Sequence, residues 1–229
     1  MTVLLFDIDN TLLNFDTAEE YALKKTFEKY NVDLTDKNLE VYSRVNKHYW
    51  LMNEQGKVTR EQLFEERFTQ AFKEMGVELS DDMKEINDVY LAYLAQSHDL
   101  ITGAFELLSE LHSEGREMHV VTNGTPTVSR PRIEDSGISS FFKEIFISEE
   151  IGANKPAKEF FDYVFNHIED ADKKKFVIIG DSLSSDILGG IKAGIKTIWY
   201  NPANLTTETI QPDITINDLS ELPQVLKNI

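Results

Sequence analysis

The chain has 229 residues, of which 41% are hydrophobic, and it carries 40 acidic side chains against 23 basic ones, a formal net charge of −17. This negative charge repels phosphate backbones and anionic lipid surfaces, so nucleic acid polymers and membranes are not expected partners. Because the chain contains no cysteine, disulfides, zinc–thiolate sites and thiol nucleophiles are excluded.

The first predicted element is a strand over Val3–Phe6 that runs directly into two aspartates one residue apart, Asp7 and Asp9. Two carboxylates at this spacing repel each other unless a cation, a shared proton or nearby donors offset the repulsion. Oxygen ligands of this kind suit Mg²⁺, which completes its shell with water and substrate phosphate. The alternative is that both aspartates only end the strand and cap the following turn.

The N-terminal region enters this strand without a basic segment. No apolar stretch approaches the roughly 20 residues that a membrane-spanning helix needs. A soluble, cytoplasmic protein is therefore expected.

Residues 15–98 contain no convincing strand and are predicted to form several amphipathic helices, among them 18–30 and 60–75. Three polar residues are the predicted N-caps of these helices, and two glycines mark breaks between them: Asp36, Thr59 and Ser80, and Gly56 and Gly76. The pattern indicates an all-helical insert placed directly after the first strand.

From residue 99 onward, short apolar runs alternate with helix-like stretches. The runs are rich in β-branched residues, as is typical of parallel strands covered on both faces. The predicted strands are 118–121, 145–147, 176–179, 197–199 and 214–216, and the predicted helices are 104–114, 129–136, 159–166 and 186–193. This alternation predicts right-handed crossovers and a doubly wound, parallel α/β sheet. The predicted domains are a core of residues 1–14 and 99–229 and a helical domain of residues 15–98.

In an open parallel sheet, ligands bind beyond the carboxyl ends of the strands, so the polar residues that follow the apolar runs are the candidate site residues. They are Asp7, Asp9 and Thr11, then Thr122, Asn123 and Gly124, then Asn154 and Lys155, and finally Asp181 and Asp186. Together they offer carboxylates, a hydroxyl, backbone amides and an ammonium, a set that suits phosphoryl transfer. Taken singly, Thr122-Asn123-Gly124 favours an ordinary turn, and Lys155 fits a common surface lysine. Asp186 fits an acidic residue in a first helical turn as well as it fits a functional role.

The order and spacing of these four segments resemble the signature motifs of the haloacid dehalogenase-like (HAD) superfamily. The insert resembles the C1-type cap of its subfamily I, so the resemblance implies a Rossmann-like core with an all-helical cap. The segment 180–190, followed by Ala193-Gly194-Ile195 and 199–202, is similar to the pyrimidine 5′-nucleotidases that act on non-standard nucleoside monophosphates. One departure from the family pattern is Arg130-Pro131-Arg132, where Pro131 is expected to disturb the local helix.

The resemblance implies a Mg²⁺-dependent phosphatase that hydrolyses small phosphate monoesters, with a pyrimidine nucleoside 5′-monophosphate as the expected substrate. Asp7 is then the nucleophile that forms an aspartyl-phosphate, and Asp9 is the general acid and afterwards the general base. The implied metal ligands are a carboxylate oxygen of Asp7, the backbone carbonyl of Asp9 and the carboxylate of Asp181.

The resemblance also implies the contacts to phosphate. Thr122 donates its hydroxyl to a phosphate oxygen, and the amides of Asn123 and Gly124 add donors near a helix start. Lys155 supplies the positive charge that screens the nucleophile from the substrate phosphate. Asp186 is expected beyond the direct metal contacts, where it orients metal-bound water or Lys155.

Within the superfamily, Asp9 favours a phosphatase, because dehalogenases need no acid for a halide leaving group and usually lack this carboxylate. A phosphatase or phosphomutase acting on sugar phosphates or phosphoglycolate is the alternative enzyme. A non-catalytic, phosphate-binding regulatory module on the same fold is the alternative from another class. Such a module is expected to lack at least one of Asp7, Asp9, Lys155 and Asp181, and all four are present. The oligomeric state is left open.

Overall fold

The computed structural model describes residues 2–168 and 172–229, which form two compact units. The core unit comprises Met1–Phe15 and His98–Ile229, and the helical unit comprises Asp16–Ser97. None of the helices in the described ranges combines the length and the apolar composition needed to span a lipid bilayer.

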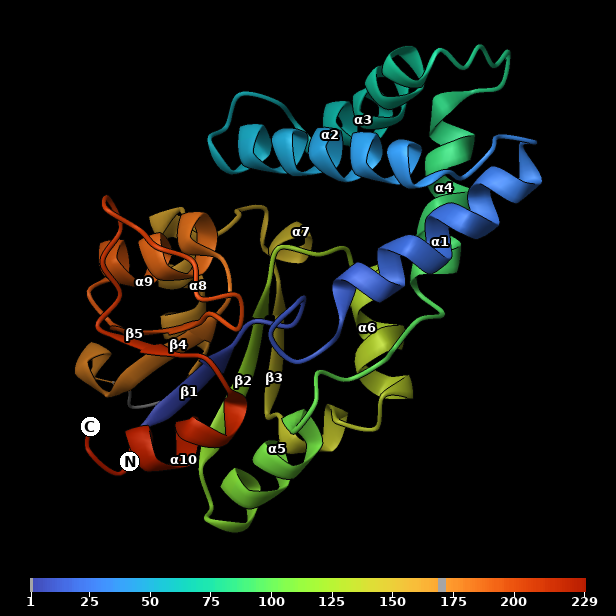
Figure 1. Ribbon diagram of the computed structural model, residues 1–229. Helices are drawn as coiled ribbons and strands as arrows, with labels where there is room; N and C mark the ends of the chain where they lie inside the picture. The colour runs from blue at the N-terminus through green and yellow to red at the C-terminus, as the bar shows by residue number, and fades with distance from the viewer. Residues whose placement is uncertain (1, 169–171) are drawn as a thin grey trace. The chain divides into compact units, whose positions relative to one another are not determined.

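The core unit is built on a six-stranded parallel sheet in the order β3-β2-β1-β4-β5-β6, which places β1, blue in Figure 1, between β2 and β4. The strands are β1 (Val3–Phe6), β2 (Glu117–Thr122), β3 (Glu144–Ile147), β4 (Phe176–Gly180), β5 (Lys196–Tyr200) and β6 (Ile214–Ile216). All five neighbouring pairs run parallel. The predicted α/β sheet is confirmed, and each predicted strand lies within one residue of an observed one.

Helices cover both faces of this sheet (Figure 1). They are α5 (Ala104–Ser113), α6 (Pro126–Asp135), α7 (Ser148–Ile151), α8 (Lys158–His167), α9 (Leu188–Ala193) and α10 (Leu222–Leu226), with the short turns η1 (Ser139–Phe141), η2 (Lys173–Lys175), η3 (Leu183–Ile187) and η4 (Leu219–Glu221). Leu4 and Phe6 of β1 pack in one apolar cluster with α5 and α10, whereas Val3 and Leu5 pack in another with α8 and α9. The crossovers therefore change face beside β1, which is where a doubly wound sheet binds its ligand.

Two features of the core differ from the sequence-based expectation. The helix predicted over 186–193 begins later, because residues up to Ile187 form the wide π-helical turn η3 and α9 starts at Leu188. Ser182 caps this turn, with its hydroxyl accepting a hydrogen bond from the Ser185 amide. Helix α6 begins at Pro126, before the predicted start at residue 129, and it continues through Pro131, whose expected disturbance of the helix stays a prediction.

Gly190 sets the distance between α9 and the sheet. A Cβ atom added at this position would lie 2.6 Å from methyl groups of both Ile178 and Thr197, closer than real Cβ contacts. Because any side chain here would push the helix off β4 and β5, the glycine serves close packing. This close packing holds α9, and with it the preceding turn η3, against the carboxyl end of β4.

The helical unit consists of α1 (Phe15–Lys29), whose first residue belongs to the core unit, together with α2 (Asp36–Glu54), α3 (Arg60–Met75) and α4 (Met83–Leu94). The predicted N-cap Thr59 is confirmed, since its hydroxyl accepts from the Gln62 amide in a capping box. The other two predicted caps are wrong. Thr35 caps α2 in place of Asp36, and Asp82 caps α4 in place of Ser80. In each helix the cap is the residue directly before the first helical residue, from which a side-chain oxygen reaches the free backbone amides.

A buried polar network lies inside the helical unit. The Arg67 guanidinium, only 2% exposed, donates to the side-chain oxygens of Asn46 at 3.0 Å and Asn87 at 2.6 Å. Asn46 in turn donates to Glu19 at 2.7 Å. The network joins α1, α2, α3 and α4 and gives both terminal nitrogens of the buried guanidinium a hydrogen-bond acceptor, whereas its Nε has none among the described residues.

Candidate active site

The candidate site begins with Asp7, directly after the last residue of the central strand β1. Its backbone amide continues the sheet by donating to the Ile179 carbonyl at 2.9 Å. The residue is 7% exposed, so its carboxylate lies in a largely water-free position beyond the carboxyl ends of β1 and β4. Thr11, in the turn after β1, lies with its hydroxyl 3.5 Å from the Asp7 carboxylate. The central strand β1 is thus followed by a buried carboxylate at the carboxyl end of the sheet, where a ligand is expected to bind.

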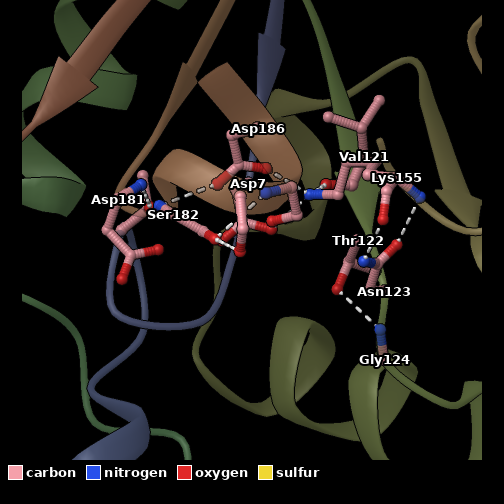
Figure 2. A network of polar contacts seen from close by, with 12 residues as sticks. Asp7, Val121, Thr122, Asn123, Gly124, Lys155, Asp181, Ser182 and Asp186 are labelled. Carbon is pink, nitrogen blue, oxygen red and sulfur yellow. Dashed lines mark hydrogen bonds and ion pairs between the residues drawn. The ribbon is translucent and has the colours of Figure 1, made fainter. Parts of the chain in front are cut away.

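Lys155 is the centre of the polar network drawn in Figure 2. Its ammonium donates to Asp7 Oδ1 at 2.7 Å, to Asp186 Oδ1 at 2.6 Å and to the Val121 carbonyl at 2.7 Å. The side chain is 1% exposed, and all three of its donors are used. Burial lowers the pKa of Lys155, but the attraction of Asp186 and Asp7 and the hydrogen bonds to both outweigh it, so the pKa lies above its ordinary value. The ammonium is therefore a fixed positive charge beside Asp7.

Asn123 holds the backbone of Lys155 in place. Its side-chain oxygen accepts from the Lys155 amide at 2.8 Å, and its side-chain nitrogen donates to the Lys155 carbonyl at 2.9 Å (Figure 2). The Lys155–Pro156 peptide bond is cis. The sequence pattern does not predict this use of the Asn123 side chain, because the resemblance implies only a phosphate contact from the Asn123 backbone amide. The loop after β2 and the loop after β3 are in this way tied together.

Asp186 lies in η3, fully buried, with both carboxylate oxygens engaged. Oδ1 accepts from Lys155, and Oδ2 accepts from the Ser182 amide at 3.1 Å. A Cβ atom at Gly180 would lie 2.3 Å from Asp186 Oδ2, so only glycine leaves room for the carboxylate here. The contact with Lys155 is one of the two that the sequence predicted for Asp186.

Asp181 follows β4, and its backbone is fixed on both sides. The amide donates to the Thr11 hydroxyl at 3.0 Å, and the carbonyl accepts from the Trp199 indole at 2.8 Å. Thr11 is one of the candidate site residues predicted from the sequence, whereas Trp199 was not identified as part of the site. With the backbone held in this way, the Asp181 side chain lies in the same cluster as Asp7.

The carboxylates of Asp7, Asp181 and Asp186 form a compact group, because each offers one oxygen and these oxygens all lie within 4.8 Å of one another. Burial raises the pKa of Asp7 to about 7, reinforced by the charges of Asp186 and Asp9 and opposed by Lys155. Burial and the neighbouring charges of Asp7 and Asp186 raise the pKa of Asp181 well above its ordinary value. One ammonium faces three carboxylates, so the donor set fits a divalent cation that prefers oxygen ligands.

The segment Thr122-Asn123-Gly124 joins β2 to α6. The Gly124 amide donates to the Thr122 hydroxyl oxygen at 3.1 Å (Figure 2). A Cβ atom at Gly124 would lie 2.2 Å from Ser129 Oγ, so the glycine permits a close approach of α6. The hydroxyl of Thr122 thus lies near the start of α6, and the predicted phosphate contacts of these residues stay predictions.

The Asp9 carboxylate binds Arg132, a residue that the sequence pattern did not connect with the site. The Arg132 guanidinium donates through Nη1 to Asp9 Oδ1, and the arginine side chain is 1% exposed. The only signal in the sequence was the unusual Arg130-Pro131-Arg132 segment. Its second arginine was not recognisable as buried, because arginines on helices are mostly exposed.

Replacing Asp181 with Asn is expected to stabilise the metal-free protein at neutral pH. Since the pKa values of Asp7 and Asp181 are raised on folding, the folded state binds more protons than the unfolded state, and stability falls as pH rises. The gain of Asp181→Asn over the wild type should be smallest near pH 4, about the ordinary pKa of Asp, and should grow toward pH 8. Thermal unfolding with a chelator present, scanned over pH, measures it.

Magnesium is expected to make the wild type more stable than Asp181→Asn, the reverse of the order without metal. At about 100 times its Kd, a ligand of the folded state adds about 2.7 kcal/mol, so the wild type should gain a clear increase in Tm and Asp181→Asn much less. Asp135→Asn, an exposed aspartate in the same unit, is the matched control and should respond like the wild type. An Asp181→Asn protein that is less stable at every pH, or one that gains as much from magnesium, would contradict the metal assignment.

The chain is similar to known proteins over most of its length. Residues 4–200 match the model of the haloacid dehalogenase-like hydrolases. The crystal structure of the HAD-hydrolase YfnB from Bacillus subtilis, bound to magnesium, superposes with a TM-score of 0.93 at 41% identity and covers 100% of this chain and 99% of that one. The pyrimidine 5′-nucleotidase PynA of Streptococcus pneumoniae is 36% identical over 99% of this chain and 95% of its own length. The pyrimidine 5′-nucleotidase YjjG of Escherichia coli is 33% identical over 97% of this chain and 96% of its own length.

Proposed function

The chain belongs to the haloacid dehalogenase-like hydrolases and is a phosphoric monoester hydrolase, and we propose that it is a Mg²⁺-dependent pyrimidine 5′-nucleotidase. The observation that carries the proposal is the placement of Asp7. Its carboxylate is buried at the carboxyl end of the central strand, 2.7 Å from the Lys155 ammonium and beside the carboxylate of Asp181. A carboxylate fixed in this way beside a cation site is suited to attack a phosphate group.

In the proposed reaction, a carboxylate oxygen of Asp7 attacks the phosphorus, and the bond between phosphorus and the ester oxygen breaks. Asp9 gives a proton to the leaving oxygen. Water then attacks the aspartyl-phosphate, Asp9 accepts its proton, and the bond between phosphorus and Asp7 breaks to release inorganic phosphate. Lys155 holds Asp7 in place throughout and offsets the negative charge that gathers around it.

The proposed phosphate contacts come from the loop after β2. The Thr122 hydroxyl and the backbone amides of Asn123 and Gly124 lie next to the start of α6, where amide donors and the helix dipole favour an anion. The side chain of Asn123 contributes indirectly, because it fixes the backbone of Lys155.

The proposed ligands of Mg²⁺ are the carboxylates of Asp7 and Asp181 and the backbone carbonyl of Asp9. When bound, the metal neutralises charge on the phosphate and on the carboxylates that surround it. Asp186, whose two oxygens already accept hydrogen bonds from Lys155 and Ser182, acts by orienting Lys155. The magnesium in the YfnB structure supports this choice of metal.

Pyrimidine nucleoside 5′-monophosphates are the proposed substrates, because PynA and YjjG, both named for this activity, match the chain over nearly its whole length. The core unit is the proposed catalytic domain. The helical unit, residues 16–97, is the proposed cap that supplies the side chains selecting the nucleoside.

Phosphate release from a panel of esters tests the proposal. With Mg²⁺ present, kcat/KM for UMP, dUMP and dTMP is expected to exceed that for AMP, glucose 6-phosphate and phosphoglycolate by at least about tenfold. A chelator should abolish turnover, and Mg²⁺ should restore it. A preference for a sugar phosphate or phosphoglycolate would overturn the substrate, and no release from any ester would overturn the activity as a whole.

A further inference from the structure

Arg132 is a buried arginine that the proposed reaction does not yet use. It lies on α6, and Nη1 donates to Asp9 Oδ1 across 123 residues of sequence. Its side chain is 1% exposed, and the ring centroid of Phe15 lies 5.8 Å from its guanidinium carbon. The arginine therefore reaches from the helix after β2 to the loop after β1, where its charge meets the carboxylate proposed as general acid and base.

The arginine two residues earlier shows what an ordinary surface pair on the same helix looks like. Arg130 donates to Glu150 at 2.7 Å, and the two side chains are 43% and 42% exposed. A pair of that kind contributes little to stability. A buried guanidinium has a much larger desolvation cost, which can cancel what its pairing with Asp9 adds to the stability of the fold. Stability of the fold therefore does not account for the burial of Arg132, and an effect of Arg132 on Asp9 does.

The two carboxylate oxygens of Asp9 have different surroundings. Arg132 binds Oδ1, and within the described residues Oδ2 accepts no hydrogen bond. A guanidinium is planar, permanently charged and stiff, so it fixes the orientation of a carboxylate better than an ammonium does. With Oδ1 held, rotation of the carboxylate is restricted, and Oδ2 is the oxygen available for proton transfer.

We propose that Arg132 is a positioning residue that holds Asp9 so that Oδ2 delivers a proton to the leaving oxygen and later accepts one from water. The inference rests on the proposed function, because it concerns the same two steps. In the first step the ester bond to phosphorus breaks as the proton moves from Asp9 to the departing oxygen. In the second step the proton of the attacking water returns to Asp9. Misplacement of Asp9 should slow the first step, which kcat/KM reports, only for esters whose leaving oxygen needs that proton.

The leaving group of the substrate therefore provides the test. The leaving group of UMP is the 5′-alkoxide of uridine, which requires protonation, whereas that of p-nitrophenyl phosphate is a stabilised phenolate, which does not. In Arg132→Met, kcat/KM for UMP is expected to fall about 10²-fold or more, and that for p-nitrophenyl phosphate by less than about tenfold. Arg132→Lys should recover part of the UMP activity, since it restores the charge without the fork geometry. Arg130→Met, on the same helix, should match the wild type with both esters.

Each outcome separates this inference from the proposed function. Wild-type turnover of both esters, with an equal loss in Arg132→Met or none, would overturn the positioning role and leave the phosphatase intact. A wild type that hydrolyses neither ester would overturn both. Far-ultraviolet circular dichroism and thermal unfolding report whether Arg132→Met folds. If it does not, the ratio of the two esters in Arg132→Lys decides, and a ratio equal to that of the wild type would count against the proposal.

Discussion

Replacing Asp7 with Asn is expected to lower kcat by at least about 10⁴-fold, the scale on which enzymes lose activity when their nucleophile is removed. The amide has no anionic oxygen to attack phosphorus, so no aspartyl-phosphate can form. The fold should persist, because Lys155 keeps its contacts with Asp186 and the Val121 carbonyl. Burial already raises the pKa of Asp7 to about 7, so a neutral side chain of the same shape should be accommodated.

Steady-state phosphate release, combined with chemical trapping, measures this effect. Borohydride reduction of a quenched reaction should convert the phosphorylated residue to homoserine at position 7 in the wild type and at no position in Asp7→Asn. Asp135→Asn, an exposed aspartate of the core unit, is the control and should retain full activity. Because Asn can deamidate to Asp, Asp7→Ala is measured alongside. Activity within tenfold of the wild type in Asp7→Ala would remove Asp7 from its role.

Lys155→Met is expected to impair both activity and stability. Loss of the ammonium leaves two buried carboxylates, Asp7 and Asp186, without the charge that lies 2.7 and 2.6 Å from them. Removing one partner of a buried ion pair typically lowers the free energy of unfolding by about 3–5 kcal/mol. Loss of a group that stabilises developing charge typically lowers kcat by about 10²–10³-fold. Urea unfolding and steady-state kinetics in Mg²⁺ measure the two effects.

The pH dependence identifies the cause of the instability. Without Lys155, which opposes the rise, the pKa of Asp7 lies still higher in the folded state, so this buried carboxyl takes up a proton as the pH falls. The deficit in unfolding free energy relative to the wild type should therefore be largest near pH 8 and shrink toward pH 5, about one unit above the ordinary pKa of Asp. Lys158→Met, a 66% exposed lysine at the start of α8, should show neither effect. A deficit that is constant over pH would point instead to lost packing.

The sequence was sufficient to predict the sheet because parallel strands buried on both faces read as continuous apolar runs. Val3–Phe6 and its partners are such runs, and all four side chains of β1 are buried. The residues brought together at the ligand edge were predictable because they lie in the segments that follow the strands. Asp7 comes directly after β1, and Lys155 and Asp186 come several residues after β3 and β4. Asp7, Lys155 and Asp186 come into contact because the carboxyl ends of parallel strands lie at one edge.

The remaining features depend on contacts that local pattern does not record. The N-caps of α2 and α4 differ from the predicted ones because neighbouring polar residues compete, and the backbone geometry selects between them. The π-helical turn η3 depends on the Ser182 cap and on the space that Gly180 leaves for Asp186. Arg132 was missed because its partner, Asp9, lies far away in the chain, and a basic residue on a helix usually indicates a solvated face.

The three acceptors of the Lys155 ammonium come from widely separated parts of the chain: the loop after β1, the end of β2 and the turn after β4. During synthesis on a ribosome, the first two emerge well before the third. A nascent polypeptide therefore cannot complete this network until η3 has been made and has docked. Enzymatic turnover consequently reports that η3 has docked beside β1 and β2, so an activity assay follows the completion of this network during folding.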